Sequence, residues 1–211
     1  NQEVSNHVSL LLQIDSTSLS ICSKDLSKFL KNIYKELQNG FKLPDSAVQN
    51  LLLIQSSNYK NDDYSNVEEF ADIFALILQQ QSKYCSNKEI VSTIEQAVLS
   101  KKVSTNIING YAKIIQTEMY QNLAEVIDSL ADLLQEGNQS EEINLAILAC
   151  IASASEVAKI PEKGLAILEN NIDSFDENIR GLSFKGLRSA QEKGHKSEVF
   201  ELWCNNVVAN L

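Results

Sequence analysis

Near its C-terminal end the chain reads Ile179-Arg180-Gly181-Leu182-Ser183-Phe184-Lys185-Gly186-Leu187, and Asp176 stands three residues ahead of this stretch. Apolar residues recur here at the spacing of three and four that is typical of an amphipathic helix. Asp176 is suited to cap this helix, because its carboxylate can accept hydrogen bonds from the first free backbone N–H groups. Ser183 and Gly186 place two small side chains on one helix face, which predicts the close approach of a neighbouring helix.

The same helical pattern extends over almost all of the 211 residues. Helix starts are marked by Ser104, Ser140 and the Ser86-x-x-Glu89 capping box, and helix ends are marked by Gly40, Gly137 and Gly194. The predicted helices cover roughly 4–14, 24–38, 45–55, 66–82, 87–100, 104–116, 118–136, 140–157, 161–170, 176–193 and 196–209. Alternation of apolar and polar residues never persists long enough to predict a strand. The sequence therefore predicts an all-α fold of about 11 helices.

The spacing of the helix starts, together with residues 179–187, resembles the HEAT and armadillo families. From residue 65 onward the starts recur every 14 to 22 residues, so helix pairs recur at about forty, the period of these repeats. Residues 179–187 resemble the second helix of a HEAT repeat, which typically reads Val-Arg-x-x-Ala-x-x-Ala-Leu after an acidic residue. Residues 143–150 match more loosely. The resemblance implies an α-solenoid superhelix of about five antiparallel helix pairs, forming a single domain over 1–211.

Two other architectures stay open at this point. Residues 185–203 also resemble one tetratricopeptide or pentatricopeptide unit, but the period of 34 to 35 residues is not repeated elsewhere. A closed helical bundle is the third possibility. Because the first residue is Asn and not Met, we expect the sequence to be a fragment of a longer chain.

No motif in the sequence points to catalysis or to a cofactor. The four cysteines (Cys22, Cys85, Cys150 and Cys204) lie far apart, so we expect buried thiols in a reducing cytoplasm and not a zinc site. His7 and His195 have no nucleophile beside them, and we expect both to be exposed in a terminal or turn segment. The pairs Asp62-Asp63 and Glu141-Glu142 lack the spacing of a calcium loop. We therefore expect no enzyme activity, no metal and no cofactor, and no apolar run is long enough to span a membrane.

Charge gives the first candidate for a functional surface. The chain has a formal net charge of −10, and between Ile114 and Ala158 it has eight acidic residues and no Lys or Arg. On one continuous helix, five of the acids would share an arc of about 80°: Glu118, Glu125, Asp128, Asp132 and Glu136. This acidic strip is either a docking site for a basic partner or a solvated face neutralised by lysines of a neighbouring helix.

The second predicted helix has charges of the opposite sign. Its four lysines, Lys24, Lys28, Lys31 and Lys35, fall within an arc of about 60°. Such a lysine row can bind an anionic membrane, a nucleic acid or an acidic partner, although it is also common on plain surface helices. Asp25 and Glu36 at its edges reduce its net charge.

These features together favour a non-enzymatic scaffold or adaptor that binds another protein through a helical-repeat surface. The acidic strip predicts that the partner has a basic segment, and the lysine row is a second candidate site. Nucleic acid is not the expected partner, because the chain is acidic overall and has only two arginines. A peripheral membrane protein or an RNA-binding repeat protein is the alternative. The expected location is the cytoplasm, which for a microbial effector would be that of the host.

Overall fold

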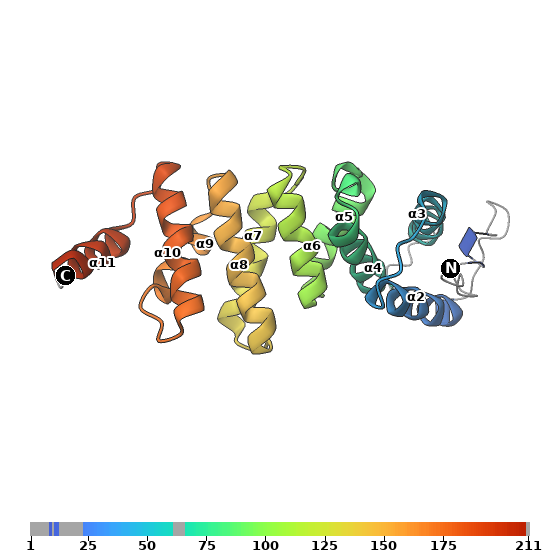
Figure 1. Ribbon diagram of the computed structural model, residues 1–211, viewed down its shortest axis with the longest axis horizontal. Helices are drawn as coiled ribbons and strands as arrows, with labels where there is room; N and C mark the ends of the chain where they lie inside the picture. Colours follow the sequence, from blue (N-terminus) through green and yellow to red (C-terminus); the bar gives the residue numbers. More distant parts are fainter. Residues whose placement is uncertain (1–8, 10, 13–22, 61–65, 210–211) are drawn as a thin grey trace.

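In the part of the chain from residue 23 onward that the structure describes, ten α-helices and one short 3₁₀ helix form two rows along a single long axis (Figure 1). This computed structural model describes residues 9, 11–12, 23–60 and 66–209, and within these ranges it contains no strand. The elements are α2 (Ser23–Gln38), α3 (Asp45–Lys60), α4 (Val67–Gln80), η1 (Ser82–Ser86), α5 (Lys88–Leu99), α6 (Thr105–Gln116), α7 (Leu123–Glu136), α8 (Glu141–Val157), α9 (Glu162–Asn171), α10 (Glu177–Glu192) and α11 (Glu198–Ala209). The all-α prediction is confirmed.

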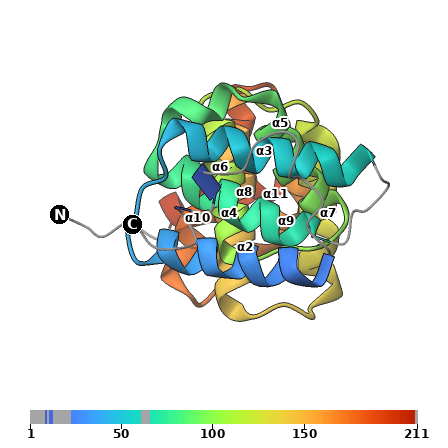
Figure 2. The same ribbon diagram turned by 90° about the vertical axis from the view of Figure 1, so that its right-hand side faces the viewer.

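The helices stack in sequence order, and the main contacts join helices that are next to each other or next but one along the chain. The first row consists of α2, α4, α6, α8 and α10, each in contact with the next. The second row contains α5, α7 and α9, which also contact one another in order. Figure 2 looks along the stack from its α2–α3 end, with those two helices in front. The described helices therefore form a stacked array like that of helical-repeat proteins.

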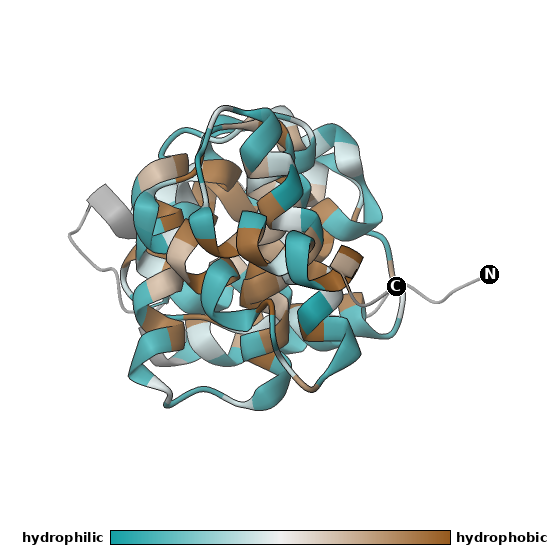
Figure 3. Ribbon diagram, turned by 90° about the vertical axis from the view of Figure 1, so that its left-hand side faces the viewer, coloured by the Kyte–Doolittle hydropathy of each residue, from teal (hydrophilic) through white to brown (hydrophobic). Residues whose placement is uncertain are grey.

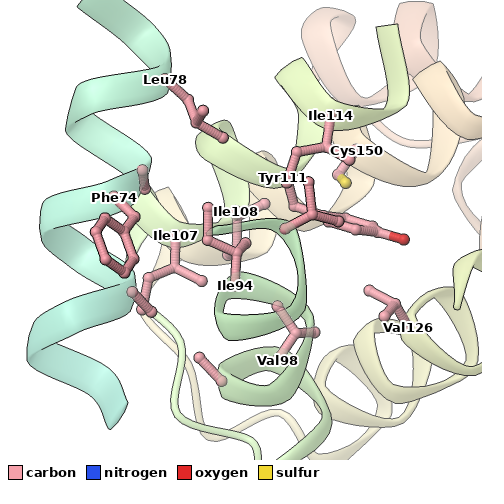
Figure 4. Packing of buried hydrophobic residues seen from close by; sticks show 14 of the residues in the cluster. Phe74, Leu78, Ile94, Val98, Ile107, Ile108, Tyr111, Ile114, Val126 and Cys150 are labelled. Atoms are coloured by element: carbon pink, nitrogen blue, oxygen red, sulfur yellow. The ribbon is translucent and has the colours of Figure 1, made fainter. Parts of the chain in front are cut away.

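The core runs along the middle of the stack, between the two rows. Apolar segments lie near the centre and hydrophilic ones around the rim when the molecule is seen from its α11 end (Figure 3). In the middle of the stack Tyr111 extends from α6 toward Cys150 and Val126 (Figure 4), and its side chain is fully buried. Burial raises the pKa of Tyr111 far above its usual value, and burial also raises the pKa of Cys150 to about 12. Cys85 is buried as well, as the sequence predicts, whereas Cys204 is half-buried.

Small residues let the helices of the first row approach closely. Ser183 is fully buried on α10, and a Cβ atom on Gly186 would lie 3.2 Å from Cα of Ala152 on α8. Ser155 Oγ also donates a hydrogen bond of 2.9 Å to the Gly186 carbonyl oxygen. The close approach predicted for this face of residues 179–187 is therefore present.

Most helix boundaries agree with the sequence pattern. Ser104, Ser140 and Asp176 each accept hydrogen bonds from the first turn of their helix, and Gly40, Gly137 and Gly194 have positive φ angles. Apart from the start of α7, two boundaries were predicted wrongly. The cap of α5 is Asn87 and not Ser86, because the Asn87 side chain accepts from the N–H groups of Glu89 and Ile90. Helix α3 continues to Lys60 and does not end near residue 55.

Other expectations fall outside the described residues. These are His7, Cys22 and the Asp62-Asp63 pair, together with the helix predicted at 4–14 apart from its residues 9, 11 and 12, which are helical. Within the described ranges, every helix is too short or too polar to span a bilayer.

Candidate functional site

The acidic strip lies on α7, but it is one residue shorter than predicted. Glu118 is not part of the helix: it lies in the turn after α6 with φ = 56°, and α7 begins only at Leu123. The cause is a contact with α5, where the buried carboxylate of Glu95 accepts hydrogen bonds from the N–H groups of Gln121 (2.8 Å) and Asn122 (3.1 Å). These bonds hold the chain in a non-helical turn before α7, so the prediction of one continuous helix from 118 to 136 was wrong.

Two of the four acids on α7 are engaged within the molecule. Glu136 forms an ion pair with Lys101, and Asp132 forms one of 2.7 Å with Lys163 on α9. The bond to Asp132 raises the pKa of the Lys163 ammonium. Lys101 lies in the turn between α5 and α6, and all four side chains are well exposed. Such pairs add little stability, but they neutralise half of the strip and support its interpretation as a solvated face.

Asp128 and His195 line the same open hollow of about 400 Å³ beside the start of α9. Lys159 and Glu162 line it too. Asp128 Oδ1 and His195 Nε2 are both buried atoms without a hydrogen-bond partner among the described residues. His195 is half-buried, although the sequence predicts an exposed turn, and it lines the same hollow as Asp128, 67 positions away in the chain.

The lysine row on α2 faces solvent, but carboxylates lie close to it. Lys28, Lys31 and Lys35 are exposed, while the side chain of Lys24 lies outside the described residues. Lys31 lines a hollow of about 370 Å³ together with acids from α4: Glu68, Glu69 and Asp72. Burial, and then repulsion from Glu68 and Glu69, raises the pKa of Asp72, and a bond from Ser104 opposes this shift. Acidic groups at this position disfavour binding of an anionic partner.

A cleft of about 530 Å³ lies between the α7–α8 hairpin and the α9–α10 hairpin. Its apolar lining comes from all four helices and consists of Leu134, Leu145, Leu148, Ile167 and Ile179. Its polar lining consists of Gln135, Gln139, Glu141, Asn144, Asn171 and Asp176. None of these lining residues is a Lys or Arg. The cleft thus combines an apolar lining with two carboxylates.

Two side chains of α8 are available within this cleft. Leu145 is 38% exposed, although most leucines of the chain are buried. The Asn144 Oδ1 atom is buried and has no hydrogen-bond donor among the described residues. By contrast, Asn171 already donates to the Ile167 carbonyl oxygen (2.8 Å), and Asp176 accepts from the Asn178 N–H (2.7 Å). A ligand could therefore cover the exposed Leu145 side chain and donate a hydrogen bond to Asn144 Oδ1.

Sequence reasoning did not identify this cleft. Its lining residues are spread over 46 positions of the chain, and stacking of two hairpins brings them together. The one available signal was Leu145, an apolar residue next to Asn144 on the side of α8 that carries its polar residues. In the described ranges no group of three or more His, Cys, Asp and Glu side chains is arranged to hold a metal ion.

Comparisons with models of protein families, with curated proteins and with solved structures found no match.

Proposed function

We propose that the chain is a non-enzymatic interaction module, built of HEAT- or armadillo-like helix pairs. It binds a basic segment of a partner protein. The observation that carries this proposal is the cleft between the two hairpins. It combines an exposed leucine with carboxylates, and no cation is among its lining residues. A groove of this chemistry suits a macromolecular segment that presents both apolar and positively charged side chains.

The acidic strip on α7 supports the same class of partner, although more weakly. Once Lys101 and Lys163 are paired, Glu125 and Asp128 are the acids of the strip that have no cation within ion-pair distance among the described residues. Charges of this kind mainly speed the encounter with a basic partner and select it over an acidic one.

The alternative function is binding to an anionic membrane or to RNA through the lysine row. The exposure of Lys28, Lys31 and Lys35 favours it. The carboxylates of Glu68, Glu69 and Asp72 beside Lys31 weaken it, because they would repel phosphate groups. We also propose a cytoplasmic location, for which the buried free thiols of Cys85 and Cys150 are the support.

The experiment for this function is reconstitution of a binary complex. The tagged chain is used to capture proteins from cell extract, and each captured protein is purified and titrated against the chain at low and high salt. We expect one protein with a basic segment to bind, and to bind less tightly as salt rises. Flotation with anionic vesicles and titration with RNA run in parallel, and binding to either without a protein partner would overturn the proposal.

A matched pair of variants tests the contribution of charge. Glu125 and Glu198 are both exposed acids in the first turn of a helix, α7 and α11 respectively. Glu125→Lys should slow association with the basic partner severalfold, whereas Glu198→Lys should leave it nearly unchanged. Equal effects of the two substitutions would show that net charge, and not the α7 strip, is recognised.

A further inference from the structure

We infer that the cleft between the α7–α8 and α9–α10 hairpins holds a short peptide segment of the partner in which a Lys or Arg side chain lies close to a large apolar one. This inference rests on the proposed function and names the chemistry of its ligand. It depends on three features of the cleft, which are its apolar lining, its two carboxylates and its unpaired amide.

The apolar lining requires an apolar side chain from the ligand. Leu145 is 38% exposed and lies beside Leu148 of the same helix, with Ile179 of α10 also lining the cleft. Water against these side chains is released when an apolar group covers them. A segment made only of charged residues would leave this part of the cleft unfilled.

The two carboxylates require a cation. Glu141 stands in the first turn of α8, and Asp176 precedes the first turn of α10, so both lie at helix N-termini. A helix N-terminus by itself attracts anions, but here each already has its own cap: Ser140 Oγ accepts from the Ile143 N–H, and Asp176 accepts from Asn178 and Ile179. Because Ser140 and Asp176 serve as the caps, the exposed carboxylate of Glu141 is available to an incoming ammonium or guanidinium group.

The unpaired amide oxygen of Asn144 favours a ligand that supplies a hydrogen-bond donor. Its Oδ1 atom is buried without a donor among the described residues, and the residue lines the cleft one position before Leu145. A rotation of the side chain would present this oxygen to a backbone N–H of a peptide or to a cationic side chain. A buried acceptor without a partner is unfavourable, so a ligand that supplies a donor gains affinity.

The test is selection from a library of random twelve-residue peptides displayed on phage, followed by titration of the selected synthetic peptides against the purified chain. We expect the selected sequences to share a Lys or Arg within a few positions of a large apolar residue. Selection of acidic sequences, or of none above background, would overturn the inference.

Matched variants locate the binding. Glu141 and Glu142 are exposed neighbours in the first turn of α8, but only Glu141 lines the cleft. Glu141→Lys should weaken peptide binding roughly tenfold, and Glu142→Lys should change it by about twofold or less. Likewise Leu145→Ser should weaken binding. Leu53→Ser, at an exposed leucine of α3, should not. Circular dichroism and thermal unfolding of each variant would verify that the fold is kept.

The outcomes separate this inference from the proposed function. If a partner protein binds but Glu141→Lys and Glu142→Lys act alike, the cleft is not the site and the interaction function stands. If no protein partner is found, yet basic peptides bind and respond to Glu141→Lys, the cleft chemistry holds and the proposed function fails. If the chain associates with itself in a way that Glu141→Lys abolishes, the occupant is a second copy and the inference is overturned.

Discussion

Gly110 lies where α4 and α6 come into contact in the middle of the stack. A Cβ atom at this position would lie 2.6 Å from Cβ and 2.8 Å from Cα of Ala75, closer than real carbon atoms approach. Because one of these atoms is backbone, the clash could be relieved only by moving a helix. Gly181, an exposed residue of α10, is different, since a Cβ atom there would meet nothing within 4 Å.

We therefore expect opposite effects from the same substitution at these two glycines. Gly110→Ala should destabilise the protein by about 1–3 kcal/mol through overpacking. Gly181→Ala should stabilise it by up to about 1 kcal/mol, because alanine favours a helix and has fewer unfolded conformations to lose. Urea unfolding of the two variants measures both changes. A Gly110→Ala protein as stable as the wild type would show that α4 and α6 do not approach so closely.

The sequence predicted the close helix contact at Ser183 and Gly186, but it did not predict the one at Gly110. Ser183 and Gly186 belong to a stretch with a recognisable helical pattern, so their role at a helix contact was predicted and found. Gly110 follows Asn109, and an Asn-Gly pair by itself suggests a turn. Its role depends on Ala75, 35 residues away, and no local pattern shows which residue a glycine will face.

At the level of single elements, the start of α7 depends on a side chain from another helix. Glu95 is 1% exposed on α5, and its carboxylate also accepts a 2.8 Å bond from the Asn122 amide. The side chain of Asn122, the residue before the helix, makes no capping bond of its own. A buried carboxylate thus replaces the local cap that begins most helices.

Removing this carboxylate should loosen the junction between α5 and α7. Glu95→Ala leaves two backbone N–H groups and one amide without an acceptor, so we expect a loss of roughly 2–4 kcal/mol in the free energy of unfolding. Glu95→Gln keeps one oxygen as an acceptor for Gln121 and Asn122 and should have a smaller effect. Chemical denaturation of both variants tests this, and equal losses would contradict the role given to the backbone bonds.

Local signals predicted most helices because most caps are local. Ser104, Ser140 and Asp176 bond to N–H groups two or three residues ahead, within reach of any sequence pattern. The α7 boundary was missed because its determinant lies 26 and 27 residues back in the chain. The error moved Glu118 onto a helix to which it does not belong and so enlarged the predicted acidic strip.

Across the whole molecule, the α11 end of the stack differs from its middle. Helix α6 has six buried residues, whereas Phe200 is the one buried residue of α11. Four apolar residues of α11 are exposed: Val199, Leu202, Val207 and Val208. Its contact with α10 is made through aromatic rings, with Phe184 at 5.6 Å from both Phe200 and Trp203.

Hydrogen exchange should reflect this difference. Since little apolar surface holds α11 in place, we expect its amides to exchange at least about tenfold faster than those of α6 under native conditions. Exchange followed by mass spectrometry of peptides from each helix measures the two rates in one sample. If α11 is protected as well as α6, another surface covers it in solution, and dilution of the sample would reveal whether that surface belongs to a second copy.

The succession of helices along the stack could be predicted, but the cleft could not. Periodicity reports which face of a helix is buried, and this was enough to predict an all-α array. The cleft arises from the space left between two hairpins, which depends on how Leu145 and Ile179 meet across helices. Likewise, the acids beside the lysine row and the lysines beside the acidic strip come from neighbouring parts of the stack.

Ion pairs and hydrogen bonds between helices reach only a short way along the stack. Four ion pairs join neighbouring parts of the stack: Lys83–Asp45, Lys101–Glu136, Lys163–Asp132 and Lys185–Glu156. The bond from Asn106 to Tyr34 spans 72 residues and still links α6 only to α2, two places along its row. A gene for such a protein could therefore gain or lose an internal pair by duplication or deletion, and the chain would keep nearly all of its remaining interfaces.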